Sequence, residues 1–226
     1  MKKWQHTVNG VKNILPIINT ISIFIIIGFL LINRPNQSDS ANNGRKAEKP
    51  RFQQGQKVDV DTNVLNNNST FFGESGRKVT LVLFNSFSCG YCRELPHTLQ
   101  KMMEKYPNDL QVIYKSFLRN EADATASHAY ECAHEQGGHK EMYNMIFKNG
   151  LTQQYLTYAA ELKLDKKSFS KCYSEKRYME KMKTDMKLAY DIGVNGTPAF
   201  LINNKLYIGL LNFKTMDELM QKELAL

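Results

Sequence analysis

The sequence predicts an α/β domain whose elements run in the order β–β–α–β, then a long helical block, then β–β–α. A β-prone run at Val79–Phe84 is followed by a helical pattern to about Tyr106 and by a second β-prone run at Leu110–Tyr114. The stretch 121–191 has apolar residues at helical spacing and no convincing strand, and a hairpin pattern follows it. Together these observations indicate an α/β domain with a helical insertion.

The first expected element is a short edge strand, because Val58 and Val60 alternate with acidic residues. The run Val79–Phe84 is almost entirely apolar, which is typical of a buried central strand. A helix follows this strand, and Pro107 helps to end it. Because Leu110–Tyr114 then reads as another strand, the three segments predict a parallel βαβ unit.

The C-terminal part returns to strand patterns. Ala199–Ile202 and Leu206–Ile208 flank Asn203-Asn204-Lys205, which predicts a β-hairpin turn. A last helix follows, and its apolar face is expected to consist of Met216, Leu219, Met220 and Leu224.

The net charge of +8 is unevenly distributed along the chain. Residues 1–32 carry three lysines and no acid, and residues 33–57 carry six basic residues against two acids, which leaves +1 for 58–226. A basic face on the domain has no support in this distribution, so no nucleic-acid partner is expected.

An apolar segment runs from Ile14 to Ile32. A helix of this length can just cross a bilayer core of about 30 Å. Its densest part, 21–32, also fits the apolar region of a cleavable signal peptide, although the nearest small-residue cleavage candidate is only Ser38-Asp39-Ser40. The segment is therefore interpreted as either a transmembrane anchor or a signal helix.

The polar tract that follows predicts a flexible linker. We expect a cytoplasmic N-terminus at 1–13, the anchor or signal segment at 14–32, the linker at 33–57 and one domain at 58–226. Basic residues flank both ends of the apolar segment, so the positive-inside rule does not favour an exported domain. Export is instead inferred from the cysteines.

Cys89 and Cys92 form a CxxC pair directly after the predicted central strand. On the first turn of a helix, Cys89 would face unpaired backbone N–H groups and the positive end of the helix dipole. Both favour the thiolate, which is the attacking species in disulfide exchange. We expect Cys89 to be the nucleophile, with a lowered pKa, and the more buried Cys92 to be the resolving thiol.

Two other interpretations of the pair are weaker. A zinc site needs a second cysteine pair or histidines at ligand spacing, and the remaining cysteines stand forty residues apart. No matching pattern is formed by His97, His128, His134 and His139. An unreactive structural disulfide does not require the strand–CxxC–helix placement that redox pairs use. No metal or organic cofactor is expected.

The other cysteines, Cys132 and Cys172, both fall in the helical block. If Cys89 and Cys92 are the redox pair, these two remain for each other, and a structural disulfide is favoured over two buried free thiols. Such a bridge would imply an oxidising compartment.

Three segments together resemble the DsbA-like branch of the thioredoxin superfamily. They are Phe84-Asn85-Ser86-Phe87-Ser88-Cys89-Gly90-Tyr91-Cys92, Glu131-Cys132-Ala133-His134-Glu135-Gln136-Gly137 and Gly193-Val194-Asn195-Gly196-Thr197-Pro198. The resemblance covers about 58–226 and implies a thioredoxin fold with a helical insertion at about 119–192. It also implies a thiol:disulfide oxidoreductase that is exported in bacteria.

The same resemblance implies that Pro198 is cis and lies opposite the cysteine pair, where Thr197 offers backbone hydrogen bonds to the substrate. Tyr91 is expected to contact the substrate as well. The implied partners are folding exported proteins and a DsbB-like or DsbD-like membrane redox protein, with residues 14–32 in the inner membrane. The catalytic domain would be periplasmic, either anchored or released.

The dipeptide Gly90-Tyr91 departs from the Pro-His of the best-known DsbA oxidases and resembles DsbC-type isomerases. A disulfide isomerase or reductase kept reduced by a membrane protein is therefore an alternative. A non-catalytic chaperone with the same fold is a second alternative, and a reductase facing the cytosol is a third.

Overall fold

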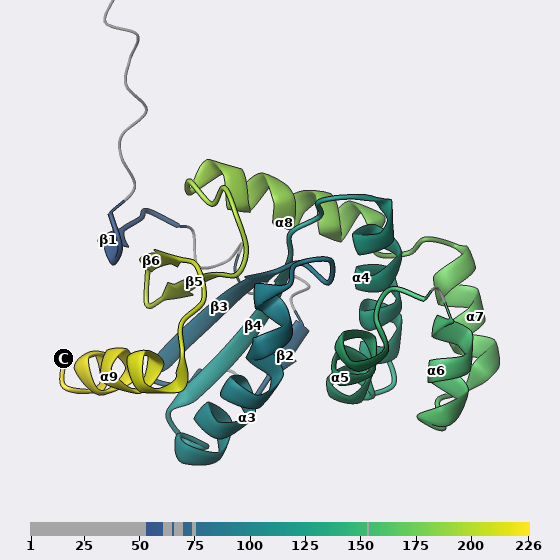
Figure 1. Cartoon of the computed structure of the whole chain (residues 1–226), viewed down its shortest axis with the longest axis horizontal. Coiled ribbons are helices and arrows are strands. Elements are labelled where there is room, and N and C mark those ends of the chain that lie inside the picture. Colours follow the sequence, from purple (N-terminus) through teal and green to yellow (C-terminus); the bar gives the residue numbers. More distant parts are fainter. Residues whose placement is uncertain (1–52, 61–64, 66–69, 74–75, 153) are drawn as a thin grey trace, which may run out of the picture. The chain divides into compact units, whose positions relative to one another are not determined.

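The computed structural model describes residues 53–60, 65, 70–73, 76–152 and 154–226 (Figure 1). The predicted anchor or signal segment and most of the predicted linker lie outside these residues. The chain divides into two units, 1–49 and 50–226, and the described residues all belong to the second. None of the helices formed by the described residues is long and apolar enough to span a membrane.

The described part contains one six-stranded sheet in the order β1-β6-β5-β3-β4-β2. Its strands are β1 Gln56–Lys57, β2 Thr70–Phe72, β3 Val79–Asn85, β4 Leu110–Ser116, β5 Ala199–Ile202 and β6 Lys205–Ile208. The helices are a 3₁₀ turn η1 Tyr91–Glu94, then α3 Leu95–Lys105, α4 Glu121–His134, α5 His139–Asn149, α6 Tyr155–Glu161, α7 Lys166–Ser174, α8 Met179–Asp191 and α9 Phe213–Leu224.

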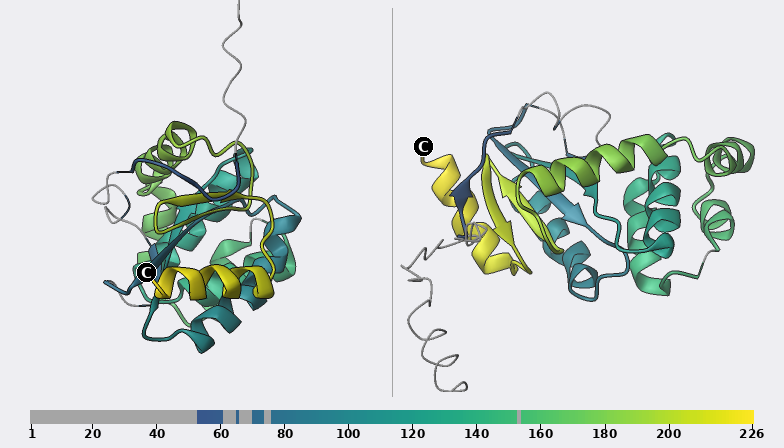
Figure 2. Two further views of the ribbon diagram at one scale, coloured as in Figure 1. Left: turned by 90° about the vertical axis from the view of Figure 1, so that its left-hand side faces the viewer. Right: turned by 90° about the horizontal axis from the view of Figure 1, so that it is seen from above.

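The central strand β3 pairs in parallel with β4 and antiparallel with β5, which confirms the predicted βαβ unit. Successive side chains of a strand point to opposite faces of the sheet. Leu81 and Leu83 accordingly belong to the hydrophobic core that includes residues of α3 and α9, whereas Val82 and Phe84 belong to the core that includes residues of α8. Figure 2 shows α3 and α9 on one side of the sheet and α8 on the other.

The expected helical insertion consists of α4 to α8, which fill the sequence between β4 and β5. Helices α4 to α7 lie beyond the end of the sheet, and α8 returns along its face (Figures 1 and 2). The hairpin expected after the insertion is β5–β6, and Asn203 and Asn204 turn it with positive φ values of 43° and 67°. Two consecutive residues with positive φ form a two-residue hairpin turn whose twist matches the right-handed twist of the flanking strands.

Two strands differ from the sequence predictions. The edge strand predicted at Val58–Val60 forms instead at Gln56–Lys57, where it pairs with Leu206 and Lys205. The N–H of Val58 then bonds the carbonyl of Asn204, in the hairpin turn where β6 begins, so the pairing cannot extend further. Strand β2 was not predicted, and it adds to the edge of β4.

Four charged side chains are buried between β4, α4 and α8. The ammonium of Lys115 lies 3.2 Å from Oδ1 of Asp185, and Lys181 lies 3.1 Å from Oδ2 of Asp185 and 2.8 Å from Glu131. Oδ2 of Asp185 also accepts the N–H of Ser116 at 3.1 Å. Buried charges are tolerated when they are paired and hydrogen-bonded in this way. The network therefore ties the insertion to the sheet.

Candidate active site

The CxxC pair lies on the loop between β3 and α3. The N–H of Cys89 donates to the carbonyl of Ser86 at 3.2 Å, and the N–H of Cys92 donates to the carbonyl of Cys89 at 3.1 Å. Both cysteines are unbonded thiols. Cys89 is 5% exposed and Cys92 is fully buried. The less buried sulfur is thus the one that a substrate can reach first.

The helix after the pair begins later than the sequence predicted. Cys92 lies in the 3₁₀ turn η1, and the α-helix begins only at Leu95. An α-helix that included Cys92 would need the N–H of Pro96 to bond the Cys92 carbonyl, and proline has no N–H. That carbonyl accepts from the N–H of Leu95 instead, which is the shorter 3₁₀ spacing.

Thr197 and Pro198 lie beside Cys89. The Cys89 thiol donates to the backbone carbonyl of Thr197 at 3.2 Å, although the two residues are 108 positions apart in the sequence. The Thr197–Pro198 peptide bond is cis. Oγ1 of Thr197 is buried and has no hydrogen-bond partner among the described residues, so it can donate to the sulfur when Cys89 ionises.

The two thiols have opposite pKa shifts. Burial raises the pKa of Cys89, but hydrogen bonding of its thiolate by Thr197 and by the thiol and backbone N–H of Cys92 outweighs it, so this pKa is lowered from 9.0. Burial dominates at Cys92 and raises its pKa to about 12. Because the thiolate is the reactive form of cysteine, the lowered pKa favours reactivity at Cys89 over Cys92.

Tyr91, which stands between the two cysteines, is 68% exposed. Pro198 is buried, whereas Thr197 is only half-buried. The structure therefore brings together Cys89, Cys92, Tyr91, Thr197 and Pro198. Tyr91 and Thr197 are the most exposed members of this group.

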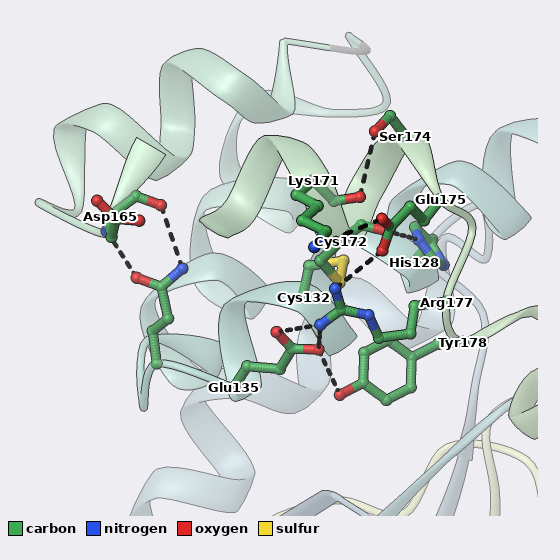
Figure 3. Close-up of a disulfide and its surroundings, with 11 residues drawn as sticks. His128, Cys132, Glu135, Asp165, Lys171, Cys172, Ser174, Glu175, Arg177 and Tyr178 are labelled. Atoms are coloured by element: carbon green, nitrogen blue, oxygen red, sulfur yellow. Dashed lines mark hydrogen bonds and ion pairs between the residues drawn. A yellow bond between two sulfur atoms is a disulfide. The ribbon is translucent and has the colours of Figure 1, made fainter. Parts of the chain in front are cut away.

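Cys132 and Cys172 lie away from this group, in the insertion. They form a disulfide that joins α4 to α7, with a Cα–Cα distance of 5.8 Å (Figure 3). Both residues are fully buried. Nearby, Arg177 donates to both carboxylate oxygens of Glu135, at 2.7 and 2.9 Å.

Within the described part of the chain, three residues of metal-binding types lie close together: His128, Cys132 and Cys172. The two sulfurs are joined to each other, and Nε2 of His128 lies 3.1 Å from the carbonyl of Cys172. A disulfide sulfur is a poor ligand compared with a thiolate. We therefore assign no metal to this group.

Sequence reasoning missed Asp123. Its fully buried carboxylate contacts Ser86 and Ser88 on the loop that leads to Cys89. The available sequence signal was the pattern Asn120-x-x-Asp123 at the start of a helix, which is typical of an N-terminal cap. That pattern explains why Asp123 lies in the first turn of α4 but not which loop it binds.

The family model described as thioredoxin matches residues 65–222. The chain belongs to the thioredoxin family. Its thioredoxin fold carries a helical insertion of the DsbA type, as the sequence predicted.

Solved structures similar to this thioredoxin-family chain include a thioredoxin-like oxidoreductase from Silicibacter pomeroyi DSS-3. That protein has a TM-score of 0.67 and 21% identity, covering 74% of this chain and 99% of the other. The thiol-disulfide exchange protein alpha-DsbA2 from Wolbachia pipientis has a TM-score of 0.64 and 15% identity, covering 71% and 90%. A periplasmic thioredoxin-like protein from Salmonella enterica serovar Typhimurium has a TM-score of 0.62 and 24% identity, covering 75% and 100%.

Among curated proteins, the chain is 24% identical over 152 residues to the Na(+)/H(+) antiporter NhaA of Herminiimonas arsenicoxydans. The match covers 66% of this chain and 24% of the antiporter. The chain thus spans about a quarter of the length of the curated relatives it matches.

Proposed function

We propose that this thioredoxin-family protein is a thiol:disulfide oxidoreductase that acts on exported polypeptides. The observation that carries the proposal is the Cys89 thiol, which has a lowered pKa and lies 3.2 Å from the carbonyl of Thr197. A low-pKa thiol within reach of a substrate is the feature that disulfide exchange requires.

The reaction proceeds in two exchanges. The Cys89 thiolate attacks one sulfur of a substrate disulfide, which forms a mixed disulfide and releases the other substrate sulfur as a thiolate that takes up a proton. The Cys92 sulfur then attacks Cys89 and breaks its bond to the substrate sulfur, which leaves and takes up the proton that the Cys92 thiol loses. This step forms the Cys89–Cys92 disulfide and releases the reduced substrate. Run in reverse, the same steps oxidise a substrate dithiol and reduce the protein.

Thr197 and Pro198 are proposed to hold the substrate strand next to Cys89, and exposed Tyr91 to contact it. Burial of Cys92, with its pKa of about 12, supports its role as resolving thiol. The disulfide between Cys132 and Cys172 is proposed to be structural, because it is fully buried in the insertion. A buried disulfide also supports an oxidising compartment.

The wider setting is proposed from the sequence. Residues 1–13 would be cytoplasmic, 14–32 an inner-membrane anchor or a signal segment, 33–57 a linker and 58–226 the catalytic domain in the periplasm, with the insertion at about 119–192. A DsbB-like membrane oxidase would recharge an oxidase, and a DsbD-like reductant would serve an isomerase. The likeness to a periplasmic thioredoxin-like protein supports this location.

The test uses Cys92→Ser, which should accumulate a mixed disulfide with a disulfide-containing polypeptide, detected by non-reducing electrophoresis. Cys89→Ser should form none and should lose turnover. A Cys89→Ser variant that keeps full activity toward unfolded polypeptides would establish the chaperone alternative and refute the proposal.

The direction of electron flow is read from the redox state of the pair in cells, after acid quenching and tagging of free thiols. A pair that is mostly disulfide indicates an oxidase. A pair that is mostly dithiol, with the second disulfide intact, indicates an isomerase or reductase. Four free thiols would refute the periplasmic location.

A further inference from the structure

The loop that carries the nucleophile is held by a carboxylate from the helical insertion. Asp123, in the first turn of α4, is fully buried. Its Oδ2 accepts the hydroxyls of Ser86 at 2.8 Å and Ser88 at 2.7 Å, and its Oδ1 accepts the N–H of Ser88 at 2.8 Å. Three donors from the residues just before Cys89 therefore converge on one side chain.

The site suits a charged acceptor. The N–H of Arg119 also donates to Oδ2, at 3.1 Å, so each of these four contacts is a donor facing the carboxylate. A carboxylate is the side chain that offers acceptors only. Within the described residues no ion pair reaches Asp123, and its carboxylate is held by these donors in the first turn of α4.

The carboxylate of Asp123 makes its hydrogen bonds mainly to the loop before Cys89 and not to the cap of its own helix. Asn120 caps α4 by accepting the N–H of Asp123 at 2.9 Å. In a complete capping box the acid at this position would reach back to the N–H of the cap residue. Here the carboxylate bonds the Arg119 N–H and the loop of β3 instead.

The residue between the two serines is fixed from the other side. Phe87 packs against aromatic rings of the insertion, with ring centroids 5.0 Å from Phe147 and 5.5 Å from Tyr143. In this turn Ser86 and Ser88 reach Asp123, while Phe87 enters the hydrophobic core. The tripeptide is held on both sides by the insertion.

The carbonyl of Ser86 then accepts the N–H of Cys89 at 3.2 Å. We propose that Asp123 is a positioning residue for disulfide exchange, which fixes the Cys89 sulfur against Thr197 by holding Ser86 and Ser88. This inference rests on the proposed function in that Cys89 is the nucleophile. It assigns to the insertion a role in the chemistry that its sequence did not reveal.

The test compares Asp123→Ala with a matched control, Asp165→Ala. Asp165 is also an aspartate at a helix N-terminus, where it caps α7 through the N–H of Ser168, and it has no recorded contact with the loop before Cys89. Two quantities are measured on each reduced variant: the pH at which the Cys89 thiolate forms, followed by ultraviolet absorbance, and the rate of reaction with glutathione disulfide.

Asp123→Ala should raise the pH of thiolate formation and slow the reaction at neutral pH by about 10- to 100-fold, the range expected when a reacting group is misplaced by about 1 Å. Asp165→Ala should leave both quantities within about two-fold of the wild type, since it weakens only its own cap. Ser88→Ala, which removes one of the three loop donors, should give a smaller change in the same direction.

Wild-type behaviour in a folded Asp123→Ala protein, or an equal loss in Asp165→Ala, would overturn the inference. If Asp123→Ala does not fold, an unchanged Ser88→Ala protein would overturn it. The proposed function fails separately: a wild-type protein that reacts with glutathione disulfide but never exchanges with a polypeptide refutes that function and leaves the role of Asp123 standing.

Discussion

The disulfide between Cys132 and Cys172 should supply a large part of the stability of the insertion. The two cysteines are 40 residues apart, so the bridge closes a long loop in the unfolded chain. The chain-entropy relation for a loop of this length gives about 4 kcal/mol at 25 °C. For a domain of this size, such a loss corresponds to a fall in Tm of about 8–16 °C.

The perturbation is the double substitution Cys132→Ala and Cys172→Ala. It should be made in a background where Cys89 and Cys92 are also alanine, so that no free thiol can exchange with the bridge during unfolding. Unfolding in urea without reductant, followed by far-UV circular dichroism, gives the difference in free energy.

A second measurement separates stability from chemistry. With Cys89 and Cys92 restored, the doubly substituted protein should react with glutathione disulfide at close to the wild-type rate below its Tm, because the bridge does not touch the reactive pair. A stability loss under about 1 kcal/mol would refute the loop-entropy argument. A loss of reactivity in the folded variant would refute the separation of the two cysteine pairs.

Three further outcomes follow from the site and the buried charges. Thr197→Val should raise the pKa of Cys89, because the hydroxyl that donates to the thiolate is lost. Thiolate absorbance measured against pH tests this shift, and an unchanged titration of Cys89 would contradict it. Asp185→Ala should cost about 3–5 kcal/mol in urea unfolding, because Lys115 is left buried without that partner, whereas Asp191→Ala at an exposed ion pair should cost less than about 1 kcal/mol. The pKa of Cys89 is lower in the folded protein than the ordinary 9.0, so the reduced protein should gain stability over Cys89→Ser as pH rises from the folded-state pKa toward 9.0. This gain should disappear as pH falls below the folded-state pKa. A difference in unfolding free energy that does not change with pH would contradict the lowered pKa.

Local patterns predicted the central elements because each has its own periodicity. The strand at Val79–Phe84 and the hairpin around Asn203 depend on residues that are adjacent in the sequence, and the structure places both close to the expected bounds. The start of α3 was predicted too early, because apolar spacing does not show that Pro96 cannot donate a hydrogen bond to the carbonyl of Cys92.

The elements that were missed depend on distant partners. Strand β2 has only three residues and exists through its pairing with β4. The carboxylates of Asp123 and Asp185 resemble ordinary helix-surface acids in the sequence. Their roles depend on Ser88 and Lys115, which belong to other elements, and no periodicity along one helix can reveal such a partner.

The pairing of β3 with β5 has a consequence for how such a protein could be rebuilt. Phe84 and Ala199 are opposite each other in this pairing, so the sulfur of Cys89 and the carbonyl of Thr197 approach from the ends of two adjacent strands. The insertion leaves the sheet after β4 and rejoins it at β5. A chimeric protein could therefore exchange α6 and α7 for another helical segment and keep the Cys89 sulfur next to the Thr197 carbonyl, provided that it retains the first turn of α4 with its carboxylate and the α5 rings that pack against Phe87.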